Sequence, residues 1–216
     1  MINIITGKPG TSKTYNLVRL SWKFLNQGKD VYSNFYINFD ELIKRQERSR
    51  LYRTKRLIQE YFYYECNLKW FMPVKRGELY FWEKLDDLIN IRGGEILIDE
   101  CQIYFNNRAW KDLPMRLQYK FQQHRKHIKR DEHGKIIGLN IWGAVQNVKR
   151  IDLIVRELVN SVYVVKKLGR IILLKQYDIE DIDKEKRYCY SNTFCWFKLR
   201  LANSYDTFQE ITGFTD

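Results

Sequence analysis

The chain has 216 residues, of which 44% are hydrophobic, and a formal net charge of +12 at pH 7. This length suits one well-buried α/β domain, and no apolar run approaches the roughly 20 residues that a membrane-spanning helix needs. The N-terminal apolar stretch is too short and its start too uncharged for a signal peptide, so we expect an intracellular protein. The positive charge favours a polyanionic partner such as nucleic acid, although acidic proteins and membrane surfaces attract the same field.

The cysteines and histidines do not indicate a metal site. The four cysteines lack the close paired spacing of zinc sites, so we interpret them as small apolar residues that a cytosolic chain keeps reduced. His124 and His127 lie three residues apart without a neighbouring carboxylate or cysteine. We interpret that cluster as a basic helix end near nucleotide or DNA.

The first βαβ unit is predicted from residue 2 to residue 35. The β-branched run 2–6 predicts a strand, and a glycine-containing loop separates it from a helix over 15–25, where Leu17, Leu20 and Phe24 recur at helical spacing. Residues 26–30 supply a stop signal, and 31–35 then predict a second strand.

A basic and aromatic segment follows at 40–76, and we predict that it is a helical insertion. One interpretation is a solvated helix pair that caps the sheet edge. The other is an arm that contacts phosphates through its arginines and stacks bases or partners on its rings. The residues concerned are Arg45, Arg48, Arg50, Arg53, Lys55 and Arg56 among Tyr52, Tyr61, Phe62, Tyr63, Tyr64 and Trp70.

Most of the remaining core elements are predicted after Gly93-Gly94. The continuous apolar run that ends at Ile98 is typical of a central parallel strand buried on both faces. A helix over 114–127, a fourth core strand over 138–146 and a short helix over 152–158 follow. Strands over 162–166 and 170–177 are expected to pair across the Leu168-Gly169 turn.

The loop after the first predicted strand matches the phosphate-binding pattern of a glycine, four free positions, then Gly-Lys and Ser or Thr. Gly7, Lys13 and Thr14 fit this pattern, while Ser12 stands in place of the second glycine. Backbone N–H groups and the helix start would cradle phosphate, Lys13 would neutralise its oxygens and Thr14 would offer a hydroxyl to Mg²⁺. The predicted ATP-binding residues are Gly7, Lys8, Pro9, Gly10, Thr11, Ser12, Lys13 and Thr14.

Acidic residues end the central strand. Asp99 is expected to hold Mg²⁺ together with Thr14. Glu100, which on a strand would point the other way, is expected to reach the attacking water as general base. Gln146 ends the following strand, where it either senses the γ-phosphate or is an ordinary polar strand end.

Arginines complete the set of candidate catalytic residues. Arg125, Arg150 and Arg156 are candidate arginine fingers, supplied in trans to a neighbouring subunit if the protein forms a ring. The predicted catalytic set is Lys13, Glu100, Gln146 and Arg125.

These elements predict an α/β fold of the RecA-like P-loop NTPase type, in which helices flank a mainly parallel central sheet. We expect one domain over 1–216, with the basic helical insertion at 40–76 and a C-terminal β-hairpin extension at 168–216.

The order of motifs resembles the zonula occludens toxin-like ATPases, which include filamentous-phage assembly proteins and lie near the FtsK/HerA-type DNA motors. The resemblance rests on short stretches that span most of the chain. They are 5–10 with Lys13-Thr14, Asn34, 98–102 with Phe105 and Arg108, His124-Arg125 before the strand ending in Gln146, and Tyr205-Asp206-Thr207.

The resemblance implies a viral or prophage motor that moves DNA with ATP and Mg²⁺ and assembles as a pentameric or hexameric ring. Capsid or membrane-embedded viral proteins would be further partners, and the location would be the host cytoplasm or a packaging vertex of the virion. Ser12 departs from the family pattern. A second departure is that phage assembly proteins carry a membrane-spanning segment, and this sequence shows none. This difference favours a resemblance to the genome-packaging ATPases of membrane-containing icosahedral viruses.

Two further functions stay open beside a DNA-translocating packaging or assembly motor. One is a nucleotide-gated interaction module with slow or absent hydrolysis, which the Ser12 replacement motivates. The other is a virion-export ATPase that acts with a separate membrane partner. A small-molecule kinase would need a lid or an acceptor site, which the sequence does not indicate.

Overall fold

The computed structural model of the protein describes residues 1–68, 72–131, 133–182, 184 and 187–206. Nine strands among these residues form one sheet, in the order β3-β2-β4-β6-β1-β7-β8-β9, with β5 paired to β6 off this path. The strands are β1 (Ile2–Thr6), β2 (Val31–Ser33), β3 (Leu79–Phe81), β4 (Gly94–Ile98), β5 (Ile128–Arg130), β6 (Ile136–Val145), β7 (Val159–Leu168), β8 (Ile171–Tyr177) and β9 (Ser191–Trp196).

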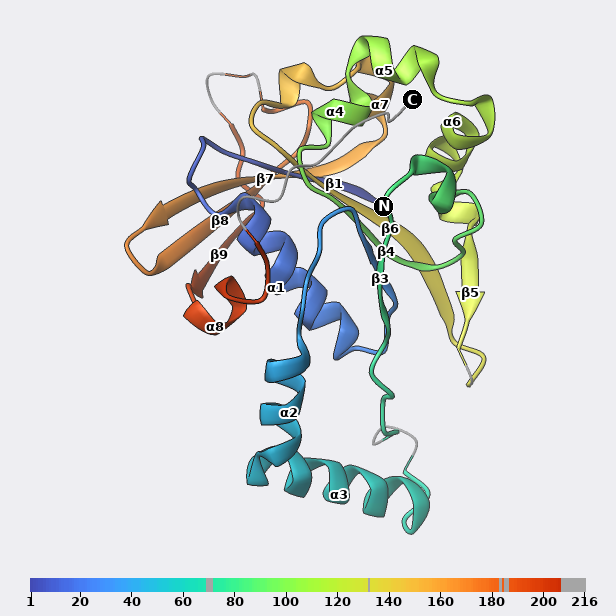
Figure 1. Ribbon diagram of the computed structural model, residues 1–216, viewed down its shortest axis with the longest axis vertical. Helices are drawn as coiled ribbons and strands as arrows, with labels where there is room; N and C mark the ends of the chain where they lie inside the picture. The colour runs from blue at the N-terminus through green and yellow to red at the C-terminus, as the bar shows by residue number, and fades with distance from the viewer. Residues whose placement is uncertain (69–71, 132, 183, 185–186, 207–216) are drawn as a thin grey trace.

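The helices lie mainly on the two faces of this sheet (Figure 1). They are α1 (Lys13–Leu25), α2 (Asp40–Arg48), α3 (Arg50–Tyr64), α4 (Gln102–Phe105), α5 (Asn107–Asp112), α6 (Met115–Gln122), α7 (Leu153–Glu157) and α8 (Leu199–Ala202). Three short 3₁₀ turns, η2 (Leu85–Leu88), η3 (His124–Lys126) and η4 (Val148–Arg150), join them. No helix in the described part of the chain is both long and apolar enough to cross a bilayer.

The central strands are buried on both faces because their side chains alternate between two hydrophobic clusters. In β1, Ile4 packs into the cluster formed with α4, α5 and α6, whereas Ile5 packs against α1. In β4, Ile96 and Leu97 divide in the same way. Figure 1 shows α1 below the central strands and α4, α5 and α7 above them. A continuous apolar run is the sequence pattern that such a doubly covered strand requires.

The predicted α/β class is confirmed. Strands β3, β2, β4, β6, β1 and β7 are parallel, and β8 and β9 continue the sheet in antiparallel pairs. The predicted hairpin is formed by β7 and β8, where Leu168 pairs with Ile171 and Gly169 takes a positive φ of 56°.

Several element boundaries differ from the sequence expectation. The strand expected over 31–35 ends at Ser33. The helix expected over 114–127 ends at Gln122, and a 3₁₀ turn covers His124–Lys126. Strands β3, β5 and β9 were not predicted, because each lies at an edge of the sheet or pairs off its main path, where few buried side chains mark a strand.

Helices α2 and α3 form a projection that we call the helical arm (residues 40–64). The arm extends away from the sheet, with α3 running across its end (Figure 1). Neither helix contains a buried residue. Leu42 and Ile43 of α2 nevertheless pack partly against the cluster that includes α1. Both functions considered for the arm, capping of the sheet edge and contact with phosphates or bases, stay predictions. Trp70, which we grouped with the arm, lies outside the described residues.

Candidate nucleotide-binding site

The phosphate loop connects the carboxyl end of β1 to the amino end of α1. Gly7 is required by a close approach, since a Cβ there would lie 2.7 Å from Thr11 Oγ1 and 2.9 Å from the Val165 carbonyl oxygen of β7. Gly10 takes a positive φ of 76°, which glycine adopts without strain. The Thr11 hydroxyl donates to the Lys8 carbonyl at 2.7 Å and closes the loop. The loop is thus a tight turn seated against β7.

Ser12 occupies the left-handed region of backbone conformation, with φ 69° and ψ 39°. This explains why the usual pattern has glycine here, because a Cβ in that region costs roughly 1–2 kcal/mol. The Ser12 side chain makes no capping hydrogen bond to α1. Its carbonyl oxygen instead accepts from the Asn16 amide side chain at 2.7 Å. The loop therefore keeps the glycine-type backbone despite the substitution.

Lys13 is nearly buried and folded back over the loop. Its ammonium group donates to the carbonyl oxygens of Gly7 at 3.1 Å and Lys8 at 3.3 Å. The positive charge thus lies above the backbone that would surround a phosphate group. It also stands at the first turn of a 13-residue helix, whose N-terminal partial charge has the same sign.

Thr14 and Asp99 lie in contact although they are 85 positions apart in the chain. The Thr14 hydroxyl donates to Asp99 Oδ2 at 2.6 Å. Burial raises the pKa of the Asp99 carboxyl above its usual range, while the hydrogen bond from Thr14 acts in the opposite direction. The contact brings the two predicted metal-binding residues to one point at the carboxyl edge of the sheet.

Asn34 holds the backbone of Asp99 from the end of β2. Its side-chain oxygen accepts from the Asp99 N–H at 2.8 Å, and its amide donates to the Asp99 carbonyl at 3.1 Å. The sequence marked Asn34 only through the family resemblance, without a role. The pairing of β2 with β4, which places the two residues side by side, is the signal that identifies it.

Glu100 does not continue a strand, so our expectation of alternating side chains at Asp99 and Glu100 was wrong. Strand β4 ends at Ile98, and Glu100 takes a positive φ of 47°. The Glu100 carboxylate accepts a hydrogen bond from the Gln102 side-chain amide, and the Glu100 N–H donates to Asp99 Oδ1 at 3.1 Å. The orientation of the Glu100 carboxylate is therefore determined by this turn and by the contact with Gln102, not by the alternation of side chains along β4.

The other candidate residues lie on different sides of the domain. Gln146 follows β6, which pairs directly with β1, and its carbonyl accepts from the Thr6 hydroxyl at 3.3 Å. The Gln146 backbone thus lies beside the end of β1, just before the phosphate loop, and the Gln146 side chain is exposed. Arg150 lies in η4 just beyond, and Arg156 lies on α7, where its Nε atom is buried without a hydrogen-bond partner in the described residues.

Arg125 lies at the opposite edge of the sheet from its own phosphate loop. It is close to the Met1 ammonium, whose pKa is lowered to about 6 by burial first and by the Arg125 charge second. Met1 precedes β1, whereas the loop follows β1. The structure does not bring Arg125 to the nucleotide site of its own chain, and its role in trans stays a prediction.

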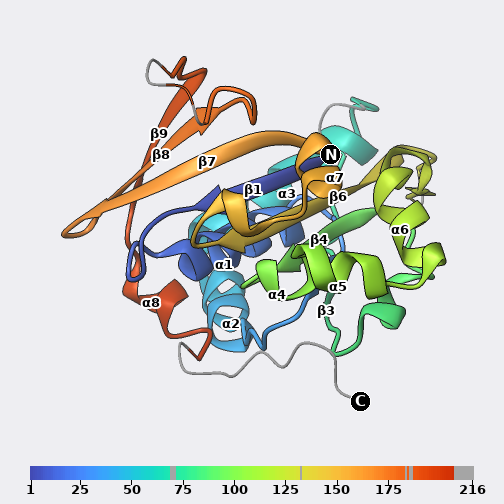
Figure 2. The same ribbon diagram turned by 90° about the horizontal axis from the view of Figure 1, so that it is seen from above.

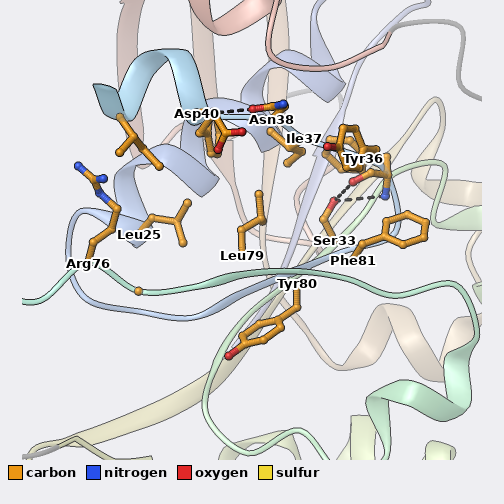
Figure 3. Close-up of a pocket in the computed structure, with 14 residues that line it drawn as sticks. Leu25, Ser33, Tyr36, Ile37, Asn38, Asp40, Arg76, Leu79, Tyr80 and Phe81 are labelled. Atoms are coloured by element: carbon orange, nitrogen blue, oxygen red, sulfur yellow. Dashed lines mark hydrogen bonds between the residues drawn. The ribbon is translucent and has the colours of Figure 1, made fainter. Parts of the chain in front are cut away.

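A separate pocket lies at the base of the helical arm (Figure 3). It is bounded by β2, β3 and the start of α2, and its lining includes Ser33, Ile37, Leu79 and Arg76. None of the phosphate-loop residues lines it, and neither Asp99 nor Glu100 does. This pocket is therefore distinct from the nucleotide site, although Ser33 directly precedes the Asn34 that holds Asp99.

The loop between β1 and α1, together with the acidic end of β4 and the intervening strand β6, defines a P-loop nucleotide-binding protein. The family model for "Zonular occludens toxin (Zot)" matches residues 1–194. The chain therefore belongs to the Zot family and is a P-loop ATPase.

Solved structures with a similar fold include two viral or bacterial proteins. The N-terminal domain of zonular occludens toxin from Neisseria meningitidis is 18% identical, with a TM-score of 0.48, and the match covers 95% of this chain and 98% of that one. The genome packaging NTPase B204 from Sulfolobus turreted icosahedral virus 2, solved with ATP-gammaS, is 10% identical, with a TM-score of 0.46, and the match covers 88% and 96%. No curated protein matches the chain in sequence.

Proposed function

We propose that this ATPase is a motor that translocates DNA during viral genome packaging or virion assembly. The observation that carries the proposal is the 2.6 Å hydrogen bond from Thr14 to Asp99, because it joins the phosphate loop and the acidic strand end in one site suited to phosphoryl chemistry. The net charge of +12 and membership of the Zot family support the extension to a DNA substrate.

The residues of the site fit a magnesium ion. Thr14 Oγ1 and Asp99 Oδ2 are hard oxygen donors that meet at the carboxyl edge of the sheet, and these two residues would hold the ion. When bound, Mg²⁺ neutralises charge that develops on the phosphate oxygens. Asn34 fixes the Asp99 backbone, so the carboxylate keeps its position relative to Thr14.

Lys13 and the loop backbone bind the phosphates of ATP. The Lys13 ammonium leaves the carbonyl oxygens of Gly7 and Lys8, which it contacts at 3.1 and 3.3 Å, and moves to phosphate oxygens. This exchange replaces two hydrogen bonds to neutral carbonyls with bonds to a charged acceptor. Nucleotide binding would thus release the Gly7 and Lys8 carbonyls of the loop that contacts β7.

Glu100 activates the attacking water. Its carboxylate takes a proton from the water as the water oxygen bonds to the γ-phosphorus, and the bond from that phosphorus to the β–γ bridging oxygen breaks to release ADP. The Gln102 amide, which donates to the Glu100 carboxylate, orients the base. Gln146 follows β6, the strand that pairs with β1, and this position supports a role in sensing the γ-phosphate.

Assembly into a ring of five or six subunits would complete this site. Arg125 lies away from its own phosphate loop, so it can act as an arginine finger only on the nucleotide of a neighbouring copy. Capsid or membrane-embedded viral proteins are the further partners of this proposal. The place of action is the host cytoplasm or the packaging vertex.

The test is the rate of phosphate release from ATP, measured at low salt with and without DNA. A motor hydrolyses faster on DNA, Glu100→Gln retains ATP binding while losing turnover, and Lys13→Ala loses binding. Glu41→Gln, which changes an exposed carboxylate on α2, is the matched control and keeps the wild-type rate. A wild-type rate that DNA leaves unchanged would contradict the translocase.

The second candidate is a nucleotide-gated interaction module with slow or absent hydrolysis. It is favoured by the left-handed Ser12 and Glu100, since both residues hold strained backbone at the site. In this case ATP binding without turnover would change the association of the protein with coat or membrane proteins. Glu100→Gln would then behave as the wild type in a pull-down with those partners, whereas a motor would lose its action on DNA. A virion-export ATPase would in addition require a separate membrane partner for activity.

A further inference from the structure

Strands β7, β8 and β9 form the antiparallel end of the sheet, at the side of the molecule and beyond the helices that cover its centre (Figures 1 and 2). Their register assigns the side chains to two faces, since residues directly opposite each other share a face. One face, which we call the outer strand face, carries three cross-strand rows: Leu168 with Ile171 and Trp196, Lys166 with Leu173 and Phe194, and Val164 with Lys175 and Asn192.

The opposite face of these strands is packed against the domain. Val165, Ile172 and Leu174 are buried in the cluster that includes α1. The outer strand face is uncovered over its aromatic residues, where Phe194 is 70% exposed and Trp196 is 66% exposed. Two large rings therefore project to solvent from a sheet whose other side is rigidly held.

The charge on this surface is of one sign. Lys166 and Lys175 share the face with the rings, and Arg170 is exposed in the turn between β7 and β8. None of the three strands contains an acidic residue, and the acidic segment that begins at Asp178 follows the far end of β8. Ile179 and Ile182 of that acidic segment pack against the cluster that includes Val162, on the same side of the sheet, so the positive charge is concentrated toward the β7–β8 turn, where the exposed rings also lie.

We propose that the outer strand face binds single-stranded nucleic acid, with bases stacked on Phe194 and Trp196 and phosphates held by Lys166, Lys175 and Arg170. Residues two apart on a strand lie about 6.7 Å apart on the same face, which lets each ring accept a separate base. Bases of a duplex are already stacked on each other, so exposed rings on a basic sheet select an unpaired strand. This inference rests on the proposed DNA translocase and names the form of DNA that it engages.

The same strands contact the nucleotide site at two points. The Val165 carbonyl lies against Gly7 at the start of the phosphate loop. Tyr15, which follows Thr14, donates its hydroxyl to the Trp196 carbonyl at 3.3 Å and accepts from the Lys198 N–H at 2.8 Å. A movement of the phosphate loop on ATP binding would therefore be transmitted to β9, which carries both rings. ATP binding and hydrolysis could in this way change the affinity of the outer strand face for single-stranded DNA.

The experiment measures fluorescence anisotropy of a labelled oligothymidine and of a duplex of equal length with the full chain. We expect Phe194→Ala and Trp196→Ala each to weaken oligothymidine binding about tenfold, since loss of one stacked base costs roughly 1–3 kcal/mol, while duplex binding and ATP affinity stay at wild-type values. Lys166→Gln is expected to lower the slope of log affinity against log salt by about 0.7. Tyr119→Ala, which removes a ring that is 53% exposed on α6, is the control and binds as the wild type.

Three outcomes are decisive. Wild-type oligothymidine affinity in both ring variants overturns the inference, and the translocase survives if DNA still stimulates ATP hydrolysis. Loss of self-association in the ring variants, measured by sedimentation, with unchanged oligothymidine affinity overturns it in favour of a subunit interface. A wild-type chain that neither binds nor responds to any DNA overturns the translocase itself. Circular dichroism melting of each variant verifies that the fold is retained.

Discussion

The nucleotide site and the helical arm differ in how far their side chains are buried. At the nucleotide site, Asp99 is 7% exposed, its side chain contacts Thr14 and its backbone is held by Asn34. On the arm, Leu51 is 85% exposed and Leu57 is 65% exposed. The first region contains polar groups that are buried and paired. The second contains apolar groups that nothing in the described residues covers. Substitutions at the first should therefore alter stability and turnover together, while substitutions at the arm or on the outer strand face should leave the fold unchanged and alter only what the protein contacts.

The largest expected effect concerns the predicted general base. Glu100→Gln should lower the rate of ATP hydrolysis by about 10²–10⁴-fold, the usual contribution of a positioned base, with little change in ATP affinity. Single-turnover kinetics and equilibrium ATP binding would measure the two quantities. Turnover within a few-fold of wild type would show that another group activates the water. The claim that substitutions at the nucleotide site lower turnover would then not hold for Glu100.

The same substitution at a buried leucine and at an exposed leucine of the arm tests whether burial decides the loss of stability. Leu17→Ala, in the fully buried face of α1, should cost about 2–5 kcal/mol of unfolding free energy, because it leaves a cavity. Leu57→Ala on α3 is the same chemical change at an exposed site and should cost under about 0.5 kcal/mol. Urea unfolding of both variants gives the difference. Equal losses would mean that the arm is packed in solution.

Asn34 should contribute to stability as well as to the site. Asn34→Ala leaves a buried N–H and a buried carbonyl of Asp99 without partners, at a cost of about 2 kcal/mol in unfolding free energy. ATP affinity measured with Mg²⁺ should fall as well, since Asp99 loses its support. Asn38→Ala is the control, because Asn38 is exposed and the contact of its side chain within the described residues is with the Asp40 N–H, away from Asp99.

Ser12 gives the smallest change and the opposite sign. Ser12→Gly should stabilise the protein by about 1 kcal/mol, because glycine takes the left-handed conformation without the cost of a Cβ. Ser12→Ala keeps the Cβ and removes a hydroxyl that makes no capping hydrogen bond to α1, so its unfolding free energy should match the wild type. Thermal melts of the two variants separate backbone strain from side-chain chemistry. A stabilised Ser12→Ala variant would refute the backbone explanation.

The sequence predicted those parts of the molecule whose signals are local. Strands β1 and β4 could be predicted because a central strand covered on both faces has a continuous run of mainly apolar residues. Strand β3 has three residues at a sheet edge, two of them exposed aromatics, and such a segment has no periodic signal.

The site divides in the same way. The phosphate-loop pattern and the acidic end of the central strand predicted Thr14 and Asp99 as one metal site, and the two side chains are in contact, while their chemical roles stay predictions. The support of Asp99 by Asn34 depends on strand pairing between residues 65 positions apart. The left-handed turn at Glu100 depends on where β4 stops, and neither feature can be deduced from local spacing alone.

The pairing of β1 affects how the protein folds during its synthesis. Ile2 pairs with Ile141 of β6 and with Val159 of β7, so β1 leaves the ribosome well before either of the strands that pair with it. Such distant pairings fold slowly. The phosphate loop is thus synthesised before the strands that anchor it, and a nascent chain that stops short of β7 lacks the strand against which Gly7 is packed.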